Sequence, residues 1–486
     1  MRTIACSLLL IGLCLAASAQ DDFAQPPFPP DDGVYRFDFG PPESGVGEGW
    51  YRVLPTDAYA AEQGFGYTEG RERPEAFDQN RRVIRDVLQL DDVTRDGIYG
   101  GTPFRVELPD GAYTVVLLTG QFTRPGANRP YSHYRDGTVT AGDVTLYEQV
   151  NSPDIFFAPD GRYFHNYYRD WRPGVDLYEV MIEPWVLMIE AQVQVTGGSL
   201  EIAATRYAPV NALWIFPEGS ADGAAAVERF KSDQRDFFNS QYAYLPDEPE
   251  LPMPDLPAEV AASGAAMYVR DNALTLRTST RPVARDIGRP LRMFASFGER
   301  EPGVIAVTPL TDIEGEIALT VSDLTGDAGT LPASAFDVRY VRYGEYPVTG
   351  GYVVKPHFLV PWMPERLQAG LTRGFWLDLI VPDDVSPGTY AGTVSLTGPG
   401  LDASLPIEVR ILPLDLPLSR CRQGVYAGNL VSTTFRHFSM DAIATFPWAF
   451  AEQVQRTRME FYVDCGFTGL YDSLPWYPLE FKDGEV

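Results

Sequence analysis

The 486-residue chain carries 66 acidic and 39 basic side chains, a formal net charge of -27. A field of this sign repels phosphate backbones and anionic lipids, which excludes nucleic acid and membrane surfaces as expected partners and leaves neutral glycans unaffected. The length corresponds to about three domains, each large enough for its own core.

Residues 1–19 have the pattern of a signal peptide. Arg2 supplies a positive start, the apolar run from Ile4 to Leu15 is too short to span a bilayer, and Ala17-Ser18-Ala19 is a small-residue cleavage pattern. We therefore expect a secreted protein, periplasmic or extracellular. Residues 20–33 follow as an acidic, proline-rich leader that we expect to be disordered.

Short alternating runs separated by glycine-rich turns predict a jelly-roll β-sandwich over residues 34–219. Residues 104–118 are predicted to form a hairpin around Pro109-Asp110-Gly111. A second hairpin is predicted to join 186–195 to 200–204 through Gly197-Gly198. The other expected strands are 35–39 and 212–216.

Residues 220–262 are predicted to be a helix and a stiff linker. Asp222 is expected to cap a helix with Val227, Phe230 and either Phe237 or Phe238 on one face, and the proline-rich segment 245–257 cannot form a regular element. Further alternating runs predict a second, immunoglobulin-like sandwich over residues 263–418. Within it we expect residues 376–396 to form a hairpin with Trp376 in the core.

The hydrophobic period changes after Pro413. A strand at 424–429, a helix opening at Pro447 and a strand at 468–471 make one βαβ step, which predicts that residues 419–486 begin a (β/α)8 barrel. A whole barrel needs roughly 250 residues, so either the chain is truncated or this segment is a small appendage. Cys421 and Cys465 are interpreted as buried free thiols rather than a disulfide.

The segment RYFHNYYRDWR, residues 162–172, mixes aromatic side chains with Arg, His, Asn and Asp. Aromatic rings stack on the apolar face of a sugar while the polar groups bond its hydroxyls, so this composition predicts a carbohydrate site. Packing of the same rings on the sandwich is the alternative. The residues assigned to carbohydrate binding are Tyr163, His165, Asn166, Tyr168, Arg169 and Trp171 here, with Tyr67 and Arg71 from an earlier aromatic region that also holds Trp50, Tyr51 and Tyr59.

Metal and catalytic motifs are missing. The four histidines share no helix face, so we expect no zinc site, and the absence of G-x-S-x-G removes support for an esterase. The run DDVTRDG from Asp91 resembles half of a calcium loop, but Pro103 stands where the last ligand should be. We therefore expect a solvated acidic turn and no cofactor, with a structural calcium in the first sandwich as the alternative.

Residues 34–217 resemble the galactose-binding-like sandwich modules attached to carbohydrate-active enzymes, including those ahead of rhamnogalacturonan acetylesterases. The motifs that carry this resemblance are FDFG at Phe37, GFGYTEGRER from Gly64, FRVELPDGAYTVVLLTG from Phe104 and VTGGSLEIAA from Val195.

Residues 290–418 resemble the sandwich that precedes the catalytic barrel in glycoside hydrolase family 123 and related bacterial hydrolases. The motifs are FGERE at Phe297, FDVRYVRY at Phe336 and FWLDLIVPDDVSPGTYAGTV from Phe375. GVYAGN at Gly424 and RMEFYVDCGFTGLYD at Arg458 are similar to the first barrel strand and helix of that group.

The second resemblance implies a secreted hexosaminidase-like glycoside hydrolase acting on galactosamine-containing glycans. In that family the substrate's acetamido oxygen attacks, and an adjacent Asp-Glu pair orients it and protonates the leaving group. The one Asp-Glu dipeptide here, Asp247-Glu248, lies in the proline-rich linker, so no catalytic residue is assigned and catalysis is expected beyond Val486. This segment is expected to contribute carbohydrate binding; the alternative is a non-catalytic carbohydrate-binding or structural envelope protein.

Overall fold

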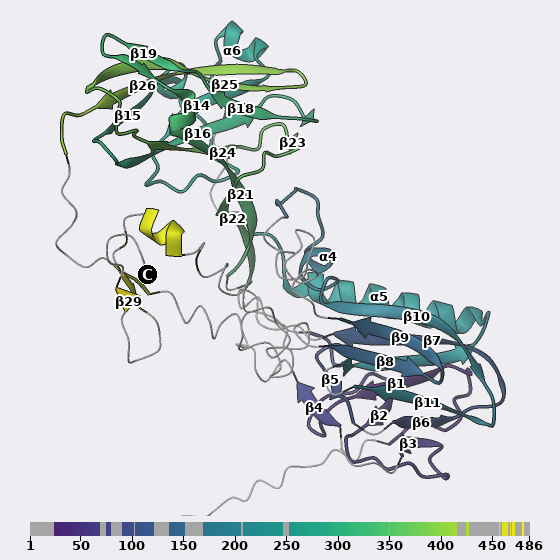
Figure 1. Cartoon of the computed structure of the whole chain (residues 1–486). Helices are drawn as coiled ribbons and strands as arrows, with labels where there is room; N and C mark the ends of the chain where they lie inside the picture. The colour runs from purple at the N-terminus through teal and green to yellow at the C-terminus, as the bar shows by residue number, and fades with distance from the viewer. Residues whose placement is uncertain are drawn as a thin grey trace, which may run out of the picture.

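The computed structural model describes residues 24–68, 74–78, 90–101, 103–120, 136–150, 169–205, 208–245, 252–348 and 350–415, with short pieces between 424 and 480. The protein is mainly β, as predicted, and its strands form several sheets. Figure 1 shows two β-sandwiches, one after the other along the chain, with a long hairpin of the second reaching toward the first. The predicted signal peptide lies outside the described residues.

The first sandwich consists of two five-stranded sheets and a small third one. The first sheet has the order β10 (Val186–Val195), β7 (Gly111–Gly120), β13 (Ala212–Pro217), β1 (Tyr35–Phe39) and β2 (Tyr51–Val53). The second has the order β3 (Phe65–Tyr67), β6 (Phe104–Glu107), β11 (Ser199–Ala204), β8 (Gly137–Ala141) and β9 (Val144–Gln149). The third has the order β12 (Pro209–Val210), β5 (Asp96–Tyr99) and β4 (Glu75–Asp78).

Both predicted hairpins of this sandwich are wrong. Strand β6 pairs with β3 and β11, whereas β7 pairs with β10 and β13, so the turn at Asp110 passes from one sheet to the other. The turn between β10 and β11 does the same, and the two turns are joined where Gly198 N donates to Asp110 Oδ1 at 2.8 Å. Alternation of apolar and polar residues shows that one face of each strand is buried. It does not show whether the next strand in the sequence pairs in the same sheet or lies in the facing sheet, because both arrangements bury that face.

Helix α5 (Ala221–Gln241) covers the outer face of the first sheet (Figure 1). Val227 and Phe238 of the helix pack with Trp214 of β13 on that face, which is why β13 and much of β7 are buried on both sides. The helix was predicted, but its cap is Ser220 rather than Asp222, because the Ser220 side chain accepts a hydrogen bond from Gly223 N at 3.1 Å. Short helices α4 (Leu177–Met181) and α6 (Ala258–Ala262) lie before β10 and before the second sandwich.

The second sandwich also has two main sheets. One has the order β14 (Ala265–Arg270), β16 (Arg300–Pro309), β24 (Arg373–Ile380), β21 (Phe336–Val348) and β22 (Gly351–Val360). The other has the order β15 (Leu291–Ala295), β26 (Leu401–Ile411), β25 (Gly388–Gly398), β19 (Leu324–Gly326) and β20 (Gly329–Leu331), with β18 (Ala318–Val321) also on β25. The minor elements are β17 (Ile313–Glu314), β23 (Arg366–Leu367), η2 (Ala284–Asp286) and η3 (Ala333–Ala335).

The predicted 376–396 hairpin is likewise a crossing between sheets. Strand β24 pairs with β16 and β21, while β25 pairs with β26 across a turn in which Gly400 has φ +70°. Trp376 was predicted in the core, but it is half-buried on the outer face of its sheet beside Val304.

The end of helix α5 joins the two sandwiches directly. Tyr352 N on β22 donates to Ala243 O at 2.9 Å, and Leu245 N donates to Tyr352 O at 2.7 Å. The segment after the helix thus extends the hairpin of β21 and β22 by main-chain bonding before the proline-rich stretch begins.

The carboxy-terminal region is described only in pieces. Strand β27 (Gly424–Tyr426) lies parallel to β28 (Gly469–Tyr471), as a βαβ step requires, and β29 (Leu479–Glu480) is antiparallel to β28. The (β/α) barrel stays a prediction, and Cys421 and Cys465 lie outside the described residues. None of the helices described has the length and apolarity needed to cross a bilayer.

Candidate functional site

A short segment at the end of the predicted aromatic cluster docks on strand β21 of the second sandwich. Trp171 N donates to Tyr343 O at 3.0 Å, and Tyr343 N donates to Asp170 Oδ1 at 2.9 Å. The Tyr340 hydroxyl donates to Asp170 Oδ2 at 2.7 Å. Burial raises the pKa of Tyr340 well above its ordinary value, so the phenol stays protonated and keeps donating at neutral pH.

Arginine side chains complete this contact between residues 169–171 and strands β21 and β24, which we call the seam. Arg373 of β24 is 3% exposed, its Nη2 donates to Trp171 O at 3.0 Å, and its guanidinium lies 5.6 Å from the centre of the Trp171 ring. Arg342 of β21 donates to the carbonyl of Arg169, and Arg169 is 3.7 Å from Glu345. The seam therefore holds residues 169–171 by their backbone as well as by their side chains.

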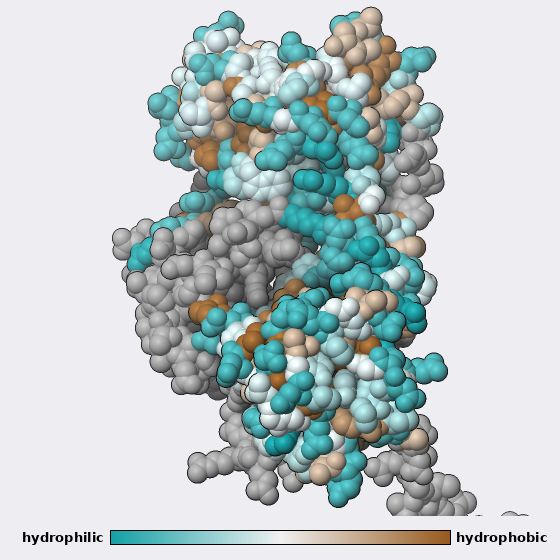
Figure 2. Space-filling view, turned by 90° about the vertical axis from the view of Figure 1, so that its right-hand side faces the viewer, coloured by the Kyte–Doolittle hydropathy of each residue, from teal (hydrophilic) through white to brown (hydrophobic). Residues whose placement is uncertain are grey.

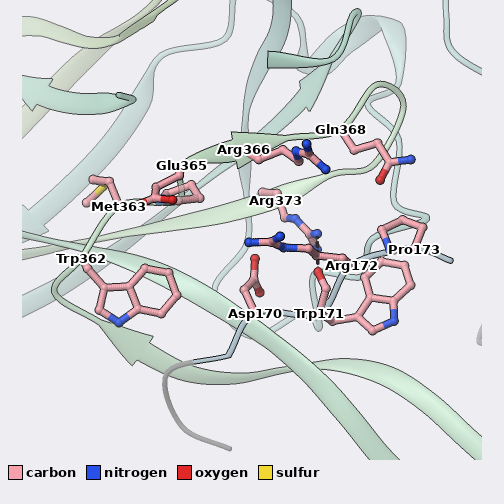
Figure 3. Close-up of a pocket in the computed structure, with 11 residues that line it drawn as sticks. Asp170, Trp171, Arg172, Pro173, Trp362, Met363, Glu365, Arg366, Gln368 and Arg373 are labelled. Carbon is pink, nitrogen blue, oxygen red and sulfur yellow. Dashed lines mark hydrogen bonds between the residues drawn. The ribbon is translucent and has the colours of Figure 1, made fainter. Parts of the chain in front are cut away.

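Beside the seam lies a cavity of about 330 Å³, which is within the size range of small-ligand sites. Figure 3 shows Trp171 and Trp362 at opposite ends of it, with Asp170, Arg172 and Arg373 grouped between them. Its lining residues are Asp170, Trp171, Arg172, Pro173, Trp362, Met363, Pro364, Glu365, Arg366, Gln368 and Arg373. We call this cavity the interdomain pocket, because the first four residues precede α4 and the others belong to the second sandwich.

The aromatic walls of the interdomain pocket are only partly free. One face of Trp171 meets Arg373, and the ring also meets Tyr244 edge-on at 6.2 Å. Trp362 is half-buried, and its ring centre lies 5.6 Å from that of Tyr340. Trp362 Nε1 is buried and has no hydrogen-bond partner in the part of the chain that the structure describes. Trp171 Nε1 is likewise buried without a partner among the described residues, so both indoles keep an unused donor, and packing accounts for part of each ring.

The predicted carbohydrate residues fall into three groups. Arg169 and Trp171 lie at the seam, and Tyr67 lies in the core of the first sandwich, 7% exposed and packed on Phe104. A ring buried in that way offers no face to a sugar at the surface, because other side chains cover it. The residues outside the described part of the chain are Tyr163, His165, Asn166, Tyr168 and Arg71.

The pocket residues of the second sandwich were missed by sequence reasoning. Apart from Arg373 of β24, they come from PWMPERLQ, residues 361–368, where Pro361 and Pro364 flank Trp362 and the charged Glu365 and Arg366 follow. The signal was present, since this loop has the same mixture of an aromatic ring with charged and amide side chains as residues 162–172.

Two other cavities fit a ligand less well. One of about 480 Å³ lies between α5 and β10, but its charges are already paired, Arg235 with Asp176 and Glu183, and Lys231 with Glu228. One of about 280 Å³ lies on the outer face of the second sandwich around Trp376 and is mostly apolar. On the face seen in Figure 2, the described surface is mainly hydrophilic with scattered apolar groups.

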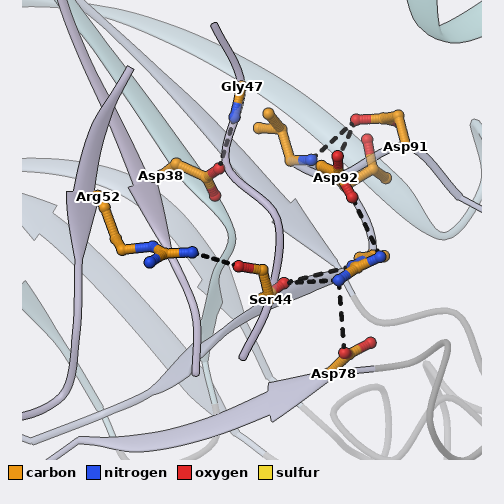
Figure 4. Close-up of polar contacts among 10 residues, drawn as sticks. Asp38, Ser44, Gly47, Arg52, Asp78, Asp91 and Asp92 are labelled. Atoms are coloured by element: carbon orange, nitrogen blue, oxygen red, sulfur yellow. Dashed lines mark hydrogen bonds and ion pairs between the residues drawn. The ribbon is translucent and has the colours of Figure 1, made fainter. Parts of the chain in front are cut away.

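A second polar site lies inside the first sandwich, where several aspartates meet the loop after β1 (Figure 4). Arg95 is 3.0 Å from Asp92 and 3.8 Å from Asp78, and its guanidinium also donates to the Ser44 hydroxyl. Among the described residues, neither Asp38 nor Asp96 has a cation within 4.0 Å. Gly47 N donates to Asp38 Oδ2 at 3.3 Å.

Asp38 and Asp96 are 3% and 1% exposed, yet Asp38 Oδ1 and both oxygens of Asp96 make no hydrogen bond of ordinary geometry within the described residues. A Cβ on Gly40 would lie 2.0 Å from Asp96 Oδ2, so the main chain closes tightly over this carboxylate. Burial raises the pKa of both groups well above the usual range, and the Asp38 charge raises that of Asp96 further. The expected solvated turn is therefore wrong for Asp96, which the sandwich buries.

These two aspartates are the residues that fit a structural cation best. Three orphaned carboxylate oxygens in a buried space are what a hard divalent ion such as calcium would use, with main-chain oxygens for its other ligands. Among the described residues no group of three or more His, Cys, Asp or Glu side chains has metal-binding geometry. A cation here would therefore depend on two side chains and the backbone.

Comparison with known proteins gives weak, partial likeness. No protein family and no curated protein matches the sequence. Among solved structures, a family 123 glycoside hydrolase from Clostridium perfringens is 12% identical, with TM-score 0.36, over 42% of this chain and 37% of that one. A Bacteroides uniformis β-glucuronidase is 15% identical, with TM-score 0.22, over 38% and 18%. A Bacillus subtilis protein is 20% identical, with TM-score 0.21, over 38% and 40%.

The chain thus spans well under half the length of these structures. The similarities include glycoside hydrolases, but they are coarse similarities of part of the fold and identify neither a reaction nor a ligand for this chain.

Proposed function

We propose that this chain binds glycans in the interdomain pocket, as the binding portion of a secreted, hexosaminidase-like glycan-processing enzyme. One observation carries the binding proposal: Trp171 and Trp362 stand at opposite ends of a cavity whose other side chains include Arg172, Glu365 and Gln368. Indole rings stack on sugar C–H faces, and charged and amide groups bond hydroxyls.

The enzymatic part of the proposal rests on the sequence resemblance of residues 290–418 to the sandwich ahead of a catalytic barrel. We assign no catalytic residue to this chain. A non-catalytic binding protein with the same pocket is the second candidate, and hydrolysis of an aryl N-acetylgalactosaminide by the full-length gene product would favour the enzyme.

We also propose that Asp38 and Asp96 hold a structural calcium ion in the first sandwich. The orphaned oxygens and the closely packed Gly40 support it. The ion would neutralise the pair and tie β1 to β5, so it would stabilise the module without taking part in a reaction.

Binding is tested by screening the purified chain on a glycan array and measuring each hit by titration calorimetry. Trp362→Ala removes the half-buried indole at one end of the pocket, and we expect it to weaken binding at least tenfold. Trp376→Ala is the matched control, because Trp376 is also half-buried but lies on the outer face of the second sandwich. Equal losses in both variants, or no glycan bound by the wild-type chain, would overturn the proposal.

A further inference from the structure

We infer that the interdomain pocket selects glycans that carry a carboxylate, such as those with a uronic acid residue, and that Arg172 binds this group. The inference rests on the proposed function, because it names the class of sugar that the same pocket takes. It depends on the balance of charge and of hydrogen bonds among the residues that line the pocket.

The first observation is a buried cation with unused donors. Arg373 is 3% exposed, and its Nη2 donates to Trp171 O. Among the described residues, its Nε and Nη1 have no hydrogen-bond partner, and no carboxylate lies within 4.0 Å of the guanidinium. A buried charge in that state favours an anion nearby.

The nearest carboxylate is already committed. Both oxygens of Asp170 accept hydrogen bonds from the second sandwich, one from the Tyr340 hydroxyl and one from Tyr343 N. The negative charge of Asp170 offsets part of the positive charge of Arg373. Because both of its oxygens are hydrogen-bonded to the second sandwich, Asp170 cannot move to pair with Arg373 directly.

The second observation is the exposed Arg172, which lines the same pocket. Within the described part of the chain it makes neither a hydrogen bond nor an ion pair. Arg366, in contrast, is paired with Glu314. Arg172 therefore offers an accessible guanidinium fork to a ligand, close to the fixed positive charge of Arg373 (Figure 3).

The remaining charged group is Glu365, which is exposed and also lines the pocket. The lining carries three arginines and two acids, and Arg366 is already paired with Glu314. The uncommitted guanidinium donors of Arg172 and Arg373, rather than a net positive charge, therefore favour an anionic ligand here. A carboxylated sugar satisfies Arg172 while its ring contacts Trp362.

The test uses matched trisaccharides that differ only at C6: α-1,4-linked trigalacturonate against its carboxyl-reduced galactose form, and the equivalent β-1,4-linked glucuronate and glucose pair. Titration calorimetry of the purified chain at about 20 mM salt should show at least one acidic member bound roughly tenfold or more tightly than its neutral partner. Raising the salt to about 300 mM should shrink this difference, because screening weakens an exposed charge pair.

Arg172→Gln should remove most of the preference for the acidic sugar and leave affinity for the neutral one within about twofold. Arg172→Lys should restore only part of it, since an ammonium lacks the planar fork. Arg292→Gln is the charge-matched control, because Arg292 is 70% exposed on β15 and pairs with Glu408; we expect no change in preference.

Neutral sugars bound as tightly as acidic ones would overturn this inference and leave the proposed function standing. A preference that survives Arg172→Gln would also overturn it. If none of these sugars binds and no other acidic glycan binds on the array, the carboxylate selectivity is wrong; binding of neutral glycans alone would then still support the proposed function.

Discussion

Two carboxylates of this protein, the half-buried Asp170 and the buried Asp96, show how differently a charged group can be used in a β-protein. Asp170 accepts hydrogen bonds on both oxygens and joins the two sandwiches. Asp96 lies under a tight loop with neither oxygen bonded in the described structure, next to Asp38 in a similar state. The satisfied hydrogen bonds of Asp170 identify it as a structural link between the two sandwiches, whereas the unbonded oxygens of Asp96 are the basis of the calcium proposal.

The largest effect is expected from Asp170→Ala. It removes the acceptor of the Tyr340 hydroxyl and of Tyr343 N and leaves Arg373 with less negative charge near it. We expect a loss of about 2–4 kcal/mol in the free energy of unfolding, measured by urea denaturation.

The control for that variant is Asp337→Ala on β21, the strand that Asp170 contacts. Asp337 pairs with Arg339 at 2.8 Å with both side chains over one-third exposed, so its removal should cost less than about 1 kcal/mol. If both variants lose the same stability, the seam does not depend on Asp170 in the way described.

A smaller effect is expected from calcium at the Asp38–Asp96 pair. At a concentration about a hundredfold above Kd, a bound ion adds about 2.7 kcal/mol, which corresponds to a rise of roughly 5–11 °C in Tm for a domain of this size. Calorimetry in millimolar calcium and in EDTA measures it. Asp96→Asn should abolish the difference, and the same variant at the exposed Asp92 should retain it.

The stability of the metal-free chain should depend on pH because Asp38 and Asp96 are buried without a partner cation among the described residues. The pKa values of Asp38 and Asp96 are raised by burial, so the folded state holds protons that the unfolded chain has released above about pH 4. Stability from these groups is therefore present at low pH and is lost as pH rises through their folded pKa values. Urea denaturation in EDTA should show wild type losing more stability between about pH 4 and pH 7 than Asp96→Asn does; parallel pH profiles would contradict this.

The smallest effect is expected at the outer part of the seam, from Glu345→Gln. Glu345 is 3.7 Å from Arg169 and accepts a 3.3 Å hydrogen bond from the Tyr244 hydroxyl. Both contacts are long, so we expect a loss of about 0.5–1 kcal/mol, well below that of Asp170→Ala. A loss as large as that of Asp170→Ala would mean that long-range charge, rather than short hydrogen bonds, holds the sandwiches together.

Much of the β-structure could be predicted from sequence because alternation reports local burial. It located the strands that became β1 and β13, and helical spacing located α5. The pairing of strands could not be predicted in this way, and three expected hairpins proved to be crossings between sheets. The doubly buried β7 illustrates why: its neighbours are β10, β13 and a helix, which follow it in the chain by 65 residues or more.

Of the candidate site, only the side formed by the segment before α4 was predicted, and the side formed by the second sandwich was not. The aromatic segment pointed to Arg169 and Trp171, but nothing local indicated that the two residues would meet β21, some 170 residues later. Tyr67 was predicted to bind a sugar but lies in the core. An aromatic residue near a turn looks the same in sequence whether its ring faces solvent or the core. Asp38 was overlooked for a related reason, since a single acid between two phenylalanines reads as the polar face of a strand.

The most direct test of the account is calorimetric titration of the wild-type chain, Trp362→Ala and Trp376→Ala with the tightest glycan found on the array. The account predicts binding by wild type, a loss of at least tenfold for Trp362→Ala, and unchanged affinity for Trp376→Ala, with all three chains unfolding within a few degrees of one another. Unchanged affinity in Trp362→Ala, with the fold intact, would contradict a glycan site between the two sandwiches.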